Sequence, residues 1–429
     1  MKAFNRNFIL MIIGQIISLF GNAILRFSLS LYVLQVTGSA SIFATILAVS
    51  ILPTILLSPF GGILADRVSR RSIMLSLDFL TSFLIFGFSM VSTRGFSIVL
   101  VAILMISLSI IQAFYQPSVQ ASIPLLVSEN QLMQANGIVV QINALATLLG
   151  PILGGFLFSF LPFSLLLNIS GTAFFLSAIL ECIMRIPFQR VATDGSMLSI
   201  IRSDCRQSLH FLRHDNPTLL HLLLLLAGLN LVLSSFITVG LPVISNITLQ
   251  LPPTFYGWLE AATAIGSGWL EAATGIGSIA GSIALPFFLK RVDMSGAWRF
   301  LLSGSLFLLP MALVLFLHTP VYIAYACIFA SSICIMLFAA LFNIYAQTFL
   351  QKSTPNQLLG KVASMVTMVV MCSYPIGQSL YGILLETFAT RVDLLILFAC
   401  IASLIISLLS RNALKTIGND CEKEAVLIQ

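Results

Sequence analysis

The sequence predicts an all-α membrane protein with twelve transmembrane helices in two six-helix bundles. Composition is the first reason, because 58% of the 429 residues are hydrophobic and only 8% are charged, whereas about 25% of the residues of a soluble protein are charged. The second reason is a series of apolar runs, each long enough to cross a bilayer. The third is that Lys and Arg gather in connections on one side of the membrane.

The apolar runs form two sets of six, separated by a polar stretch. The expected spans lie at 8–36, 42–65, 72–93, 96–119, 133–160, 162–186, 219–247, 254–289, 297–317, 320–350, 358–388 and 391–411. The first run is longer than the apolar core of a signal peptide and has no convincing cleavage site, so we expect it to remain as a span. The predicted organisation is a first bundle at 1–186, a cytoplasmic linker with an amphipathic helix at 187–218, a second bundle at 219–411 and a cytoplasmic tail at 412–429.

The positions of the basic residues predict the orientation. If the N-terminus is cytoplasmic, all but three of the 21 Lys and Arg residues lie on the cytoplasmic side, the exceptions being Arg26, Arg94 and Arg391. This bias predicts a multi-pass protein of the cell membrane with both termini in the cytoplasm. The net charge of +6 therefore reports orientation and not nucleic-acid binding, because no basic face is interleaved with exposed aromatic residues.

The sequence gives little indication of a metal site, a bound cofactor or nucleotide binding. The seven cysteines and four histidines show neither a disulfide framework nor the spacing of metal ligands, so we expect no metal and no cofactor. The sequence has no G-x-x-x-x-G-K-[ST] loop, which argues against ATP as the energy source.

A short connection between the second and third spans carries the most informative motif. Residues 61–71 read GGILADRVSRR; glycines let helices approach closely, and an acidic residue here is placed to meet a helix end or a nearby Arg. The motif resembles the loop between helices 2 and 3 of the major facilitator superfamily, G-x-L-a-D-r-x-g-r-[RK]. The resemblance implies a role in conformational change for Gly62, Asp66, Arg67, Arg70 and Arg71. The alternative is an ordinary basic stop signal between two spans.

The fifth span carries a second motif. Residues 146–155 read ATLLGPILGG, which resembles the antiporter signature of drug exporters, G-x-x-x-G-P-x-x-G-G, with Ala146 in place of the first glycine. Small residues four apart permit close helix contact, and a proline permits a bend. The resemblance implies that Gly150, Pro151, Gly154 and Gly155 tune opening and closing; the alternative is generic close packing.

Two further segments resemble the macrolide-efflux and siderophore-exporter branch of the superfamily. They are residues 113–132, and LHFLRHDNP at 209–217, which leads into the seventh span. One departure concerns the fourth span, where family members often carry an Arg associated with proton coupling. This chain has no charge between 103 and 114, and Leu108 takes the expected position, which places the family's usual proton coupling in doubt.

Ionisable residues inside spans are costly and are functional candidates by default. We identify Arg26, Asp78 and Glu271 as candidates for the substrate or proton pathway. An alternative interpretation of Arg26 is that its side chain extends outward to water. An alternative interpretation of Asp78 is that it pairs with the arginines at 67–71. The uncharged candidates are Gln112, Gln141, Asn143, Asn230 and Asn343.

A tandem duplication lengthens the eighth span. GWLEAATAIGS at 257–267 is followed at once by GWLEAATGIGS at 268–278, which adds about 16 Å of helix at 1.5 Å per residue. We interpret it as a slippage duplication without function. The surplus is expected to emerge on the outer side as extra turns or a bulge, which leaves Glu260 in or near water and Glu271 facing the cavity.

Taken together, these features predict a secondary active transporter. We expect it to act as a monomer in the lipid bilayer and to export small hydrophobic or amphiphilic compounds, such as macrolide-type antibiotics or similar drugs, by proton antiport. The alternative is export of an endogenous metabolite such as a siderophore or a lipid. A polytopic membrane enzyme would need a cluster of His, Asp, Ser or Lys at one depth, and the spans offer none convincingly.

The role implied for Asp66 gives a first prediction. We expect Asp66→Asn to abolish transport while the protein still folds and inserts, because a charged contact worth about one to a few kcal/mol would be lost. Transport assays on a well-expressed variant check this. Wild-type transport rates would contradict the assignment.

Overall fold

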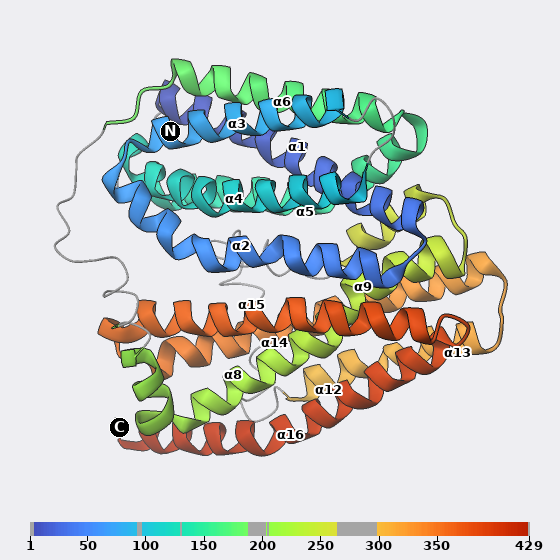
Figure 1. The fold of residues 1–429 in the computed structure, drawn as a ribbon. Coiled ribbons are helices and arrows are strands. Elements are labelled where there is room, and N and C mark those ends of the chain that lie inside the picture. Colours follow the sequence, from blue (N-terminus) through green and yellow to red (C-terminus); the bar gives the residue numbers. More distant parts are fainter. Residues whose placement is uncertain are drawn as a thin grey trace. The chain divides into compact units, whose positions relative to one another are not determined.

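A computed structural model describes residues 4–91, 97–128, 131–187, 203, 206–263 and 298–427. These residues form helices and their connections, with no strand among them (Figure 1). The all-α class predicted from the sequence is confirmed.

Six long helices make up the first part of the chain. They are α1 (Arg6–Thr37), α2 (Ala40–Arg67), α3 (Arg70–Val91), α4 (Ile98–Leu126), α5 (Leu132–Phe160) and α6 (Phe163–Ile183). Local sequence sets several of their ends. α1 ends at Gly38, whose φ of 59° lies in the left-handed region that glycine adopts without strain. α2 begins after Ser39, whose hydroxyl accepts a hydrogen bond from the Ile42 amide.

The second part begins with an interrupted helix. Its segments are η3 (Phe211–Asp215), α8 (Pro217–Leu229), η4 (Asn230–Ser234), α9 (Ser235–Val243) and η5 (Ile244–Thr248), where η marks a π-helical turn. Pro217 suits the first turn of α8 because it lacks an N–H, and the Asn216 side chain caps the Leu219 amide. The remaining helices are α12 (Trp298–Leu306), α13 (Leu308–Phe316), α14 (Val321–Ser353), α15 (Asn356–Thr387) and α16 (Val392–Leu427).

Eleven helices of the described residues are long and apolar enough to cross a membrane. They account for eleven of the twelve expected spans. The eighth span was expected at 254–289; residues 253–263 are helical, and 264–297 lie outside the described residues. Most of the linker expected at 187–218 also lies outside them. The tail expected at 412–429 continues α16 as helix as far as Leu427.

Contacts divide the chain into two compact units. The first unit comprises Met1–Met197 and Gln250–Ala261, and the second comprises Leu198–Leu249 and Ala262–Gln429. In the first unit α2 packs on α4, α3 packs on α6, and α1 packs on both α5 and α6 (Figure 1). A Cβ atom on Gly61 of α2 would overlap the carbonyl oxygen of Ala113 in α4. Glycine is therefore what allows these two backbones to touch.

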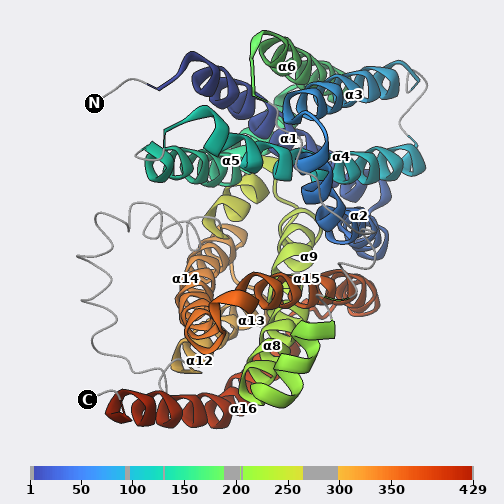
Figure 2. The same ribbon diagram turned by 90° about the vertical axis from the view of Figure 1, so that its left-hand side faces the viewer.

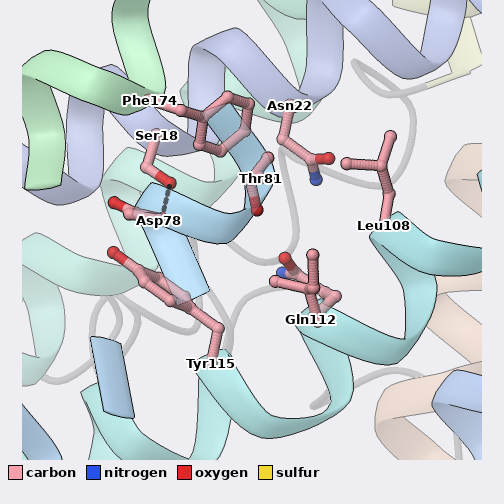
Figure 3. A pocket seen from close by; sticks show the side chains of 9 residues that line it. Ser18, Asn22, Asp78, Thr81, Leu108, Gln112, Tyr115 and Phe174 are labelled. Atoms are coloured by element: carbon pink, nitrogen blue, oxygen red, sulfur yellow. Dashed lines mark hydrogen bonds between the residues drawn. The ribbon is translucent and has the colours of Figure 1, made fainter. Parts of the chain in front are cut away.

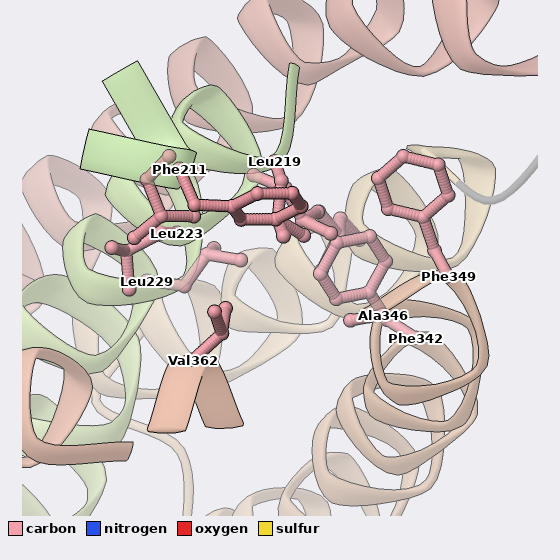
Figure 4. Packing of buried hydrophobic residues seen from close by; sticks show 11 residues of the cluster. Phe211, Leu219, Leu223, Leu229, Phe342, Ala346, Phe349 and Val362 are labelled. Atoms are coloured by element: carbon pink, nitrogen blue, oxygen red, sulfur yellow. The ribbon is translucent and has the colours of Figure 1, made fainter. Parts of the chain in front are cut away.

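The second unit has its own apolar core. α12 packs on α14 and α16, α13 packs on the same two helices, and α8 packs on both α15 and α16 (Figure 2). One cluster of buried side chains joins η3 and α8 to α14 and α15 (Figure 4). Its buried members are Phe211, Leu212, Leu219, Leu222, Leu223, Leu229, Leu301, Phe342, Ala346, Phe349 and Val362.

The two adjacent glycines of α2 provide a matched pair for mutation. Gly61→Ala should lower the melting temperature in detergent, because overpacking against a backbone costs about 1–3 kcal/mol. Gly62→Ala should be neutral or stabilising, because a Cβ there meets nothing within 4 Å and alanine favours helix over glycine by about 1 kcal/mol. Equal melting temperatures for the two variants would contradict the α2–α4 contact.

Candidate functional site

A buried carboxyl group lies at the centre of the first unit. Asp78 of α3 is 1% exposed, and its Oδ1 accepts a hydrogen bond from the Ser18 hydroxyl of α1 at 3.3 Å (Figure 3). Ser177 of α6 lies beside the same carboxyl group. Oδ2 has no hydrogen-bond partner among the described residues. The alternative in which Asp78 pairs with the arginines at 67–71 is therefore wrong, because α1 and α6 enclose the carboxyl group and supply hydroxyl groups instead.

A second buried carboxyl group lies nearby. Glu181 of α6 is 1% exposed, and its Oε1 accepts a hydrogen bond from the hydroxyl of Tyr115 in α4 at 3.0 Å. Asp78 and Glu181 are close enough to interact electrostatically. Within the described residues, Oε2 of Glu181 lacks a hydrogen-bond partner, as Oδ2 of Asp78 does. The two carboxyl groups therefore form a pair with one free oxygen each.

Sequence analysis missed Glu181 and Tyr115. Glu181 lies near the end of its span, where an acidic residue is easily assigned to the membrane surface. The signal was the polar stripe of α6: Ser170, Ser177 and Glu181 are separated by seven and four residues, which places them on one helical face. All three side chains are buried. A stripe of small polar groups that ends in a carboxylate indicates an internal polar site better than the single charge does.

Gln15 adds a third polar group to this region. Its side chain is 1% exposed, and it precedes Ser18 by one helical turn on α1. Neither its amide oxygen nor its amide nitrogen has a hydrogen-bond partner in the part of the chain that the structure describes. A buried polar group left unpaired costs about 1–3 kcal/mol. Such groups in a native protein usually serve a function or meet a solute.

A small cavity of about 10 Å³ adjoins Asp78 (Figure 3). Its lining comprises Ser18, Asn22, Asp78, Thr81, Leu108, Ile111, Gln112, Tyr115 and Phe174. This is about the space that one water molecule needs. Two of the candidates predicted from the sequence, Asp78 and Gln112, therefore share one cavity. Leu108, which takes the position expected for an Arg, also contributes to the wall.

Arg26 of α1 turns towards α4 and does not extend outward. Its Nε donates to Oδ1 of Asn22 at 3.1 Å, and its Nη1 and Nη2 both donate to the hydroxyl oxygen of Ser109 at 3.1 Å. The alternative in which it extends to water is therefore wrong, because two neutral oxygen acceptors within the bundle hold the guanidinium.

The remaining uncharged candidates do not join this cavity. The amides of Asn143 and Asn230 donate to carbonyl groups of their own helices, at 2.9 Å and 3.1 Å. Gln141 and Asn343 have exposed side chains. Glu271 lies outside the described residues.

The motif at 61–71 lies where α2 ends at Arg67 and α3 begins at Arg70. Arg71 donates hydrogen bonds to the backbone carbonyl oxygens of Glu181 and Cys182, in the last turn of α6. A cation at a helix C-terminus satisfies carbonyl groups that the helix itself leaves unpaired. The side chain of Asp66 is not among those that the structure describes. Of the two glycines expected to permit a close approach, Gly61 contacts α4 and Gly62 does not.

The α5 motif is a close-packing surface. A Cβ atom on Gly150 would lie 2.5 Å from the Cβ of Ala23 in α1, and one on Gly154 would lie 2.9 Å from the ring of Phe27. Gly155 and Pro151 instead contact the helix at 253–263, where a Cβ on Gly257 would lie 2.5 Å from the Pro151 carbonyl oxygen. Larger residues at Gly150 or Gly154 would push α1 away from α5, and a larger residue at Gly155 would push away the helix at 253–263.

These contacts describe the start of the first copy of the duplication. Its described part, residues 257–263, is regular helix packed on α5. The remainder of both copies lies outside the described residues, so the extra turns or bulge stay a prediction. Tyr256 stacks on Phe27 with ring centroids 4.8 Å apart, and its hydroxyl donates to Oε2 of Glu260 at 3.1 Å. Glu260 is half-buried and accepts this hydrogen bond, and its expected position in or near water stays a prediction. Gly257 lets this helix pack closely on α5.

A larger pocket of about 550 Å³ lies in the second unit, among the connections that follow η5, α13 and α15. Its charged residues compensate one another, because Arg391 and Asp393 form an ion pair at 3.3 Å. Sequence analysis identified no residue of its lining as functional. The buried polar groups of the first unit are therefore the stronger candidate site.

The sequence profile of the Major Facilitator Superfamily matches residues 11–378. The chain belongs to the major facilitator superfamily. It is a multi-pass membrane transporter, and not an enzyme.

Similar proteins agree with this assignment. Macrolide efflux protein A of Streptococcus pyogenes is 26% identical over 387 residues, which cover 88% of each chain. The uncharacterized MFS-type transporter YkuC of Bacillus subtilis is 22% identical over 91% of this chain and 88% of its own. In fold, the chain is similar to the nucleoside transporter NupG, with a TM-score of 0.70 at 13% identity over 96% and 99% of the two chains. The fold is also similar to that of a bacterial homologue of the iron transporter ferroportin. The TM-score is 0.65 at 17% sequence identity, over 96% of this chain and 98% of that chain.

The contact of Arg71 with α6 gives a prediction about stability. Arg71→Gln should reduce the free energy of unfolding by about 1.5 kcal/mol, because charged hydrogen bonds to the carbonyl groups of α6 are lost. Thermal unfolding of the purified protein measures this. Arg213→Gln is the matched control, since Arg213 is exposed in η3, and it should leave the melting temperature unchanged. If the two variants unfold at the same temperature, Arg71 does not stabilise α6.

Proposed function

We propose that this transporter exports small hydrophobic or amphiphilic compounds by proton antiport. The proposed location is the cell membrane, with the protein as a monomer and both termini in the cytoplasm. The similarity to macrolide efflux protein A over most of both chains supports export and a drug-like cargo. The positive bias of one side of the sequence supports the orientation.

The observation that carries proton coupling is the buried pair of Asp78 and Glu181. Two ionised carboxylates placed close together among apolar helices repel each other and lose their hydration. No ion pair within the described residues neutralises either of them. The pair is therefore most stable when at least one carboxyl group holds a proton. Oδ2 of Asp78 and Oε2 of Glu181, which lack hydrogen-bond partners there, are the atoms proposed to hold it.

The surrounding hydroxyl groups support this role. Ser18 and Tyr115 each occupy one carboxyl oxygen as a hydrogen-bond donor, so the second oxygen of each group is left for the proton. The cavity at Asp78 gives that side of the pair a polar neighbourhood through Asn22 and Gln112. Release and uptake of the proton are proposed to accompany the change between outward-open and inward-open states. Asp66 and its neighbours, together with the glycines of α5, are proposed to take part in that change.

Proteoliposomes with an imposed pH gradient test the proton pathway. Asp78→Asn and Glu181→Gln keep the size and one acceptor oxygen of each side chain but remove the titratable group. Each should reduce gradient-driven transport about tenfold or more, equivalent to about 1.4 kcal/mol, and should leave folding intact. Exposed Glu386 provides the matched control, and Glu386→Gln should transport as the wild type does. Wild-type dependence on the gradient in both buried variants would refute this pathway.

A further inference from the structure

Arg26 is a positive charge within a membrane-spanning helix, and its hydrogen-bond acceptors are all neutral. Its guanidinium donates to the side-chain oxygen of Asn22 and, through two nitrogens, to the hydroxyl of Ser109. No acidic side chain of the described residues forms an ion pair with it. A charge at this depth is costly unless an opposite charge or a polar cavity meets it. The arrangement therefore lacks a negative group.

The guanidinium retains donors for such a group. Arginine carries five N–H donors in a planar fork, and the hydrogen bonds to Asn22 and Ser109 use three of them. The side chain is half-buried, so it is not sealed from a solute. A carboxylate that accepts from a remaining N–H makes a charge-assisted hydrogen bond, which is roughly twice as strong as a bond between neutral groups.

The residues around Arg26 are held in place from three helices. Thr54 of α2 donates through its hydroxyl to the backbone carbonyl of Ser109 at 3.0 Å. One turn further along α4, the Gly61–Ala113 contact keeps α2 and α4 together. Asn22, which orients the Nε of Arg26, also lines the cavity beside Asp78. A site fixed by rigid helices binds its ligand with a smaller loss of conformational entropy than a site on loops.

We propose that Arg26, positioned by Asn22 and Ser109, binds the carboxylate of the transported compound, and that the cargo is an acidic amphiphile. The inference rests on the proposed export function and narrows its substrate class. The carboxylate accepts from one of the two remaining N–H donors, which point away from each other, while the apolar part of the cargo lies among the surrounding hydrophobic side chains. A cationic drug would meet repulsion at the same place.

Binding of a matched pair of fluorescent probes to the purified full-length protein tests the inference. The probes are dansylamino-undecanoic acid and its primary amide, which share shape and apolar surface and differ in charge. The wild type should bind the acid roughly tenfold more tightly than the amide, as expected for one charge-assisted hydrogen bond. Arg26→Gln should abolish that preference by weakening the acid and leaving the amide unchanged. Arg26→Lys should give an intermediate preference, because it keeps the charge and loses the fork.

Two serines of α4 supply a second, milder comparison. Ser109→Ala removes the acceptor that positions the guanidinium and should reduce the preference for the acid. Ser107 donates only to the Ile103 carbonyl of its own helix, so Ser107→Ala should leave the preference unchanged. These substitutions keep the test valid if Arg26→Gln fails to fold.

The outcomes separate this inference from the proposed function. Equal binding of acid and amide by the wild type, including no measurable binding of either, overturns the inference. The same holds if Arg26→Gln weakens both probes alike, since Arg26 is then structural. The inference is also overturned if the Asp78→Asn variant loses the preference for the acid while the Arg26→Gln variant keeps it. The proposed function fails on a different measurement, which is the absence of gradient-driven transport in the wild type.

Discussion

The cost of burying polar groups among membrane-spanning helices governs this structure. Most polar side chains of the spans avoid that cost locally, as Asn143 and Asn230 do by donating to carbonyl groups of their own helices. Serine and threonine hydroxyls such as Thr81 and Ser118 do the same. In the first unit Asp78, Glu181, Gln15 and Arg26 are held by side chains of other helices or lack partners among the described residues. The second unit also contains buried groups without a partner there, among them Gln378 and Tyr381. What distinguishes the first unit is that its exceptions include charged residues, which cost the most to bury and are therefore the ones proposed to have a function.

Much of the fold could be predicted from the sequence because a bilayer imposes a minimum length on each apolar run. Asp78 could be predicted as well, since a lone charge inside a span is conspicuous. The partners of such a charge could not, because they depend on which helices pack together. Ser18 and Ser177 read as ordinary small residues until α1, α3 and α6 are seen to enclose Asp78. Glu181 was missed for the related reason that distance from a span's end does not reveal burial.

The glycine positions also show that the sequence predicts a kind of contact without identifying the residue that makes it. The sequence indicates that two glycines near the end of α2 permit a close approach, but not which of them faces α4; the structure assigns that role to Gly61. In the duplicated segment the eleven-residue repeat nearly preserves the helical face, so the sequence cannot show which copy docks. The contact of Gly257 with Pro151 shows that the described part of the first copy packs on α5. A pattern identifies a class of contact, and the neighbouring helix selects the residue.

α1 is the element on which the proposed sites converge. Ser18, Asn22 and Arg26 follow at four-residue intervals, so they form a stripe that turns slowly around the helix. One end of this stripe binds the Asp78 carboxyl group, the other binds α4 through Ser109, and Asn22 lies between them at the cavity. Neighbouring positions of α1 pack on the glycines of α5, where Gly150 faces the Cβ of Ala23 and Gly154 faces the ring of Phe27. Coupling between two sites requires an element whose position both of them bias. A rotation or shift of α1 on the glycines of α5 would change the environment of Asp78 and of Arg26 together, so we propose this helix as the physical link between proton and cargo.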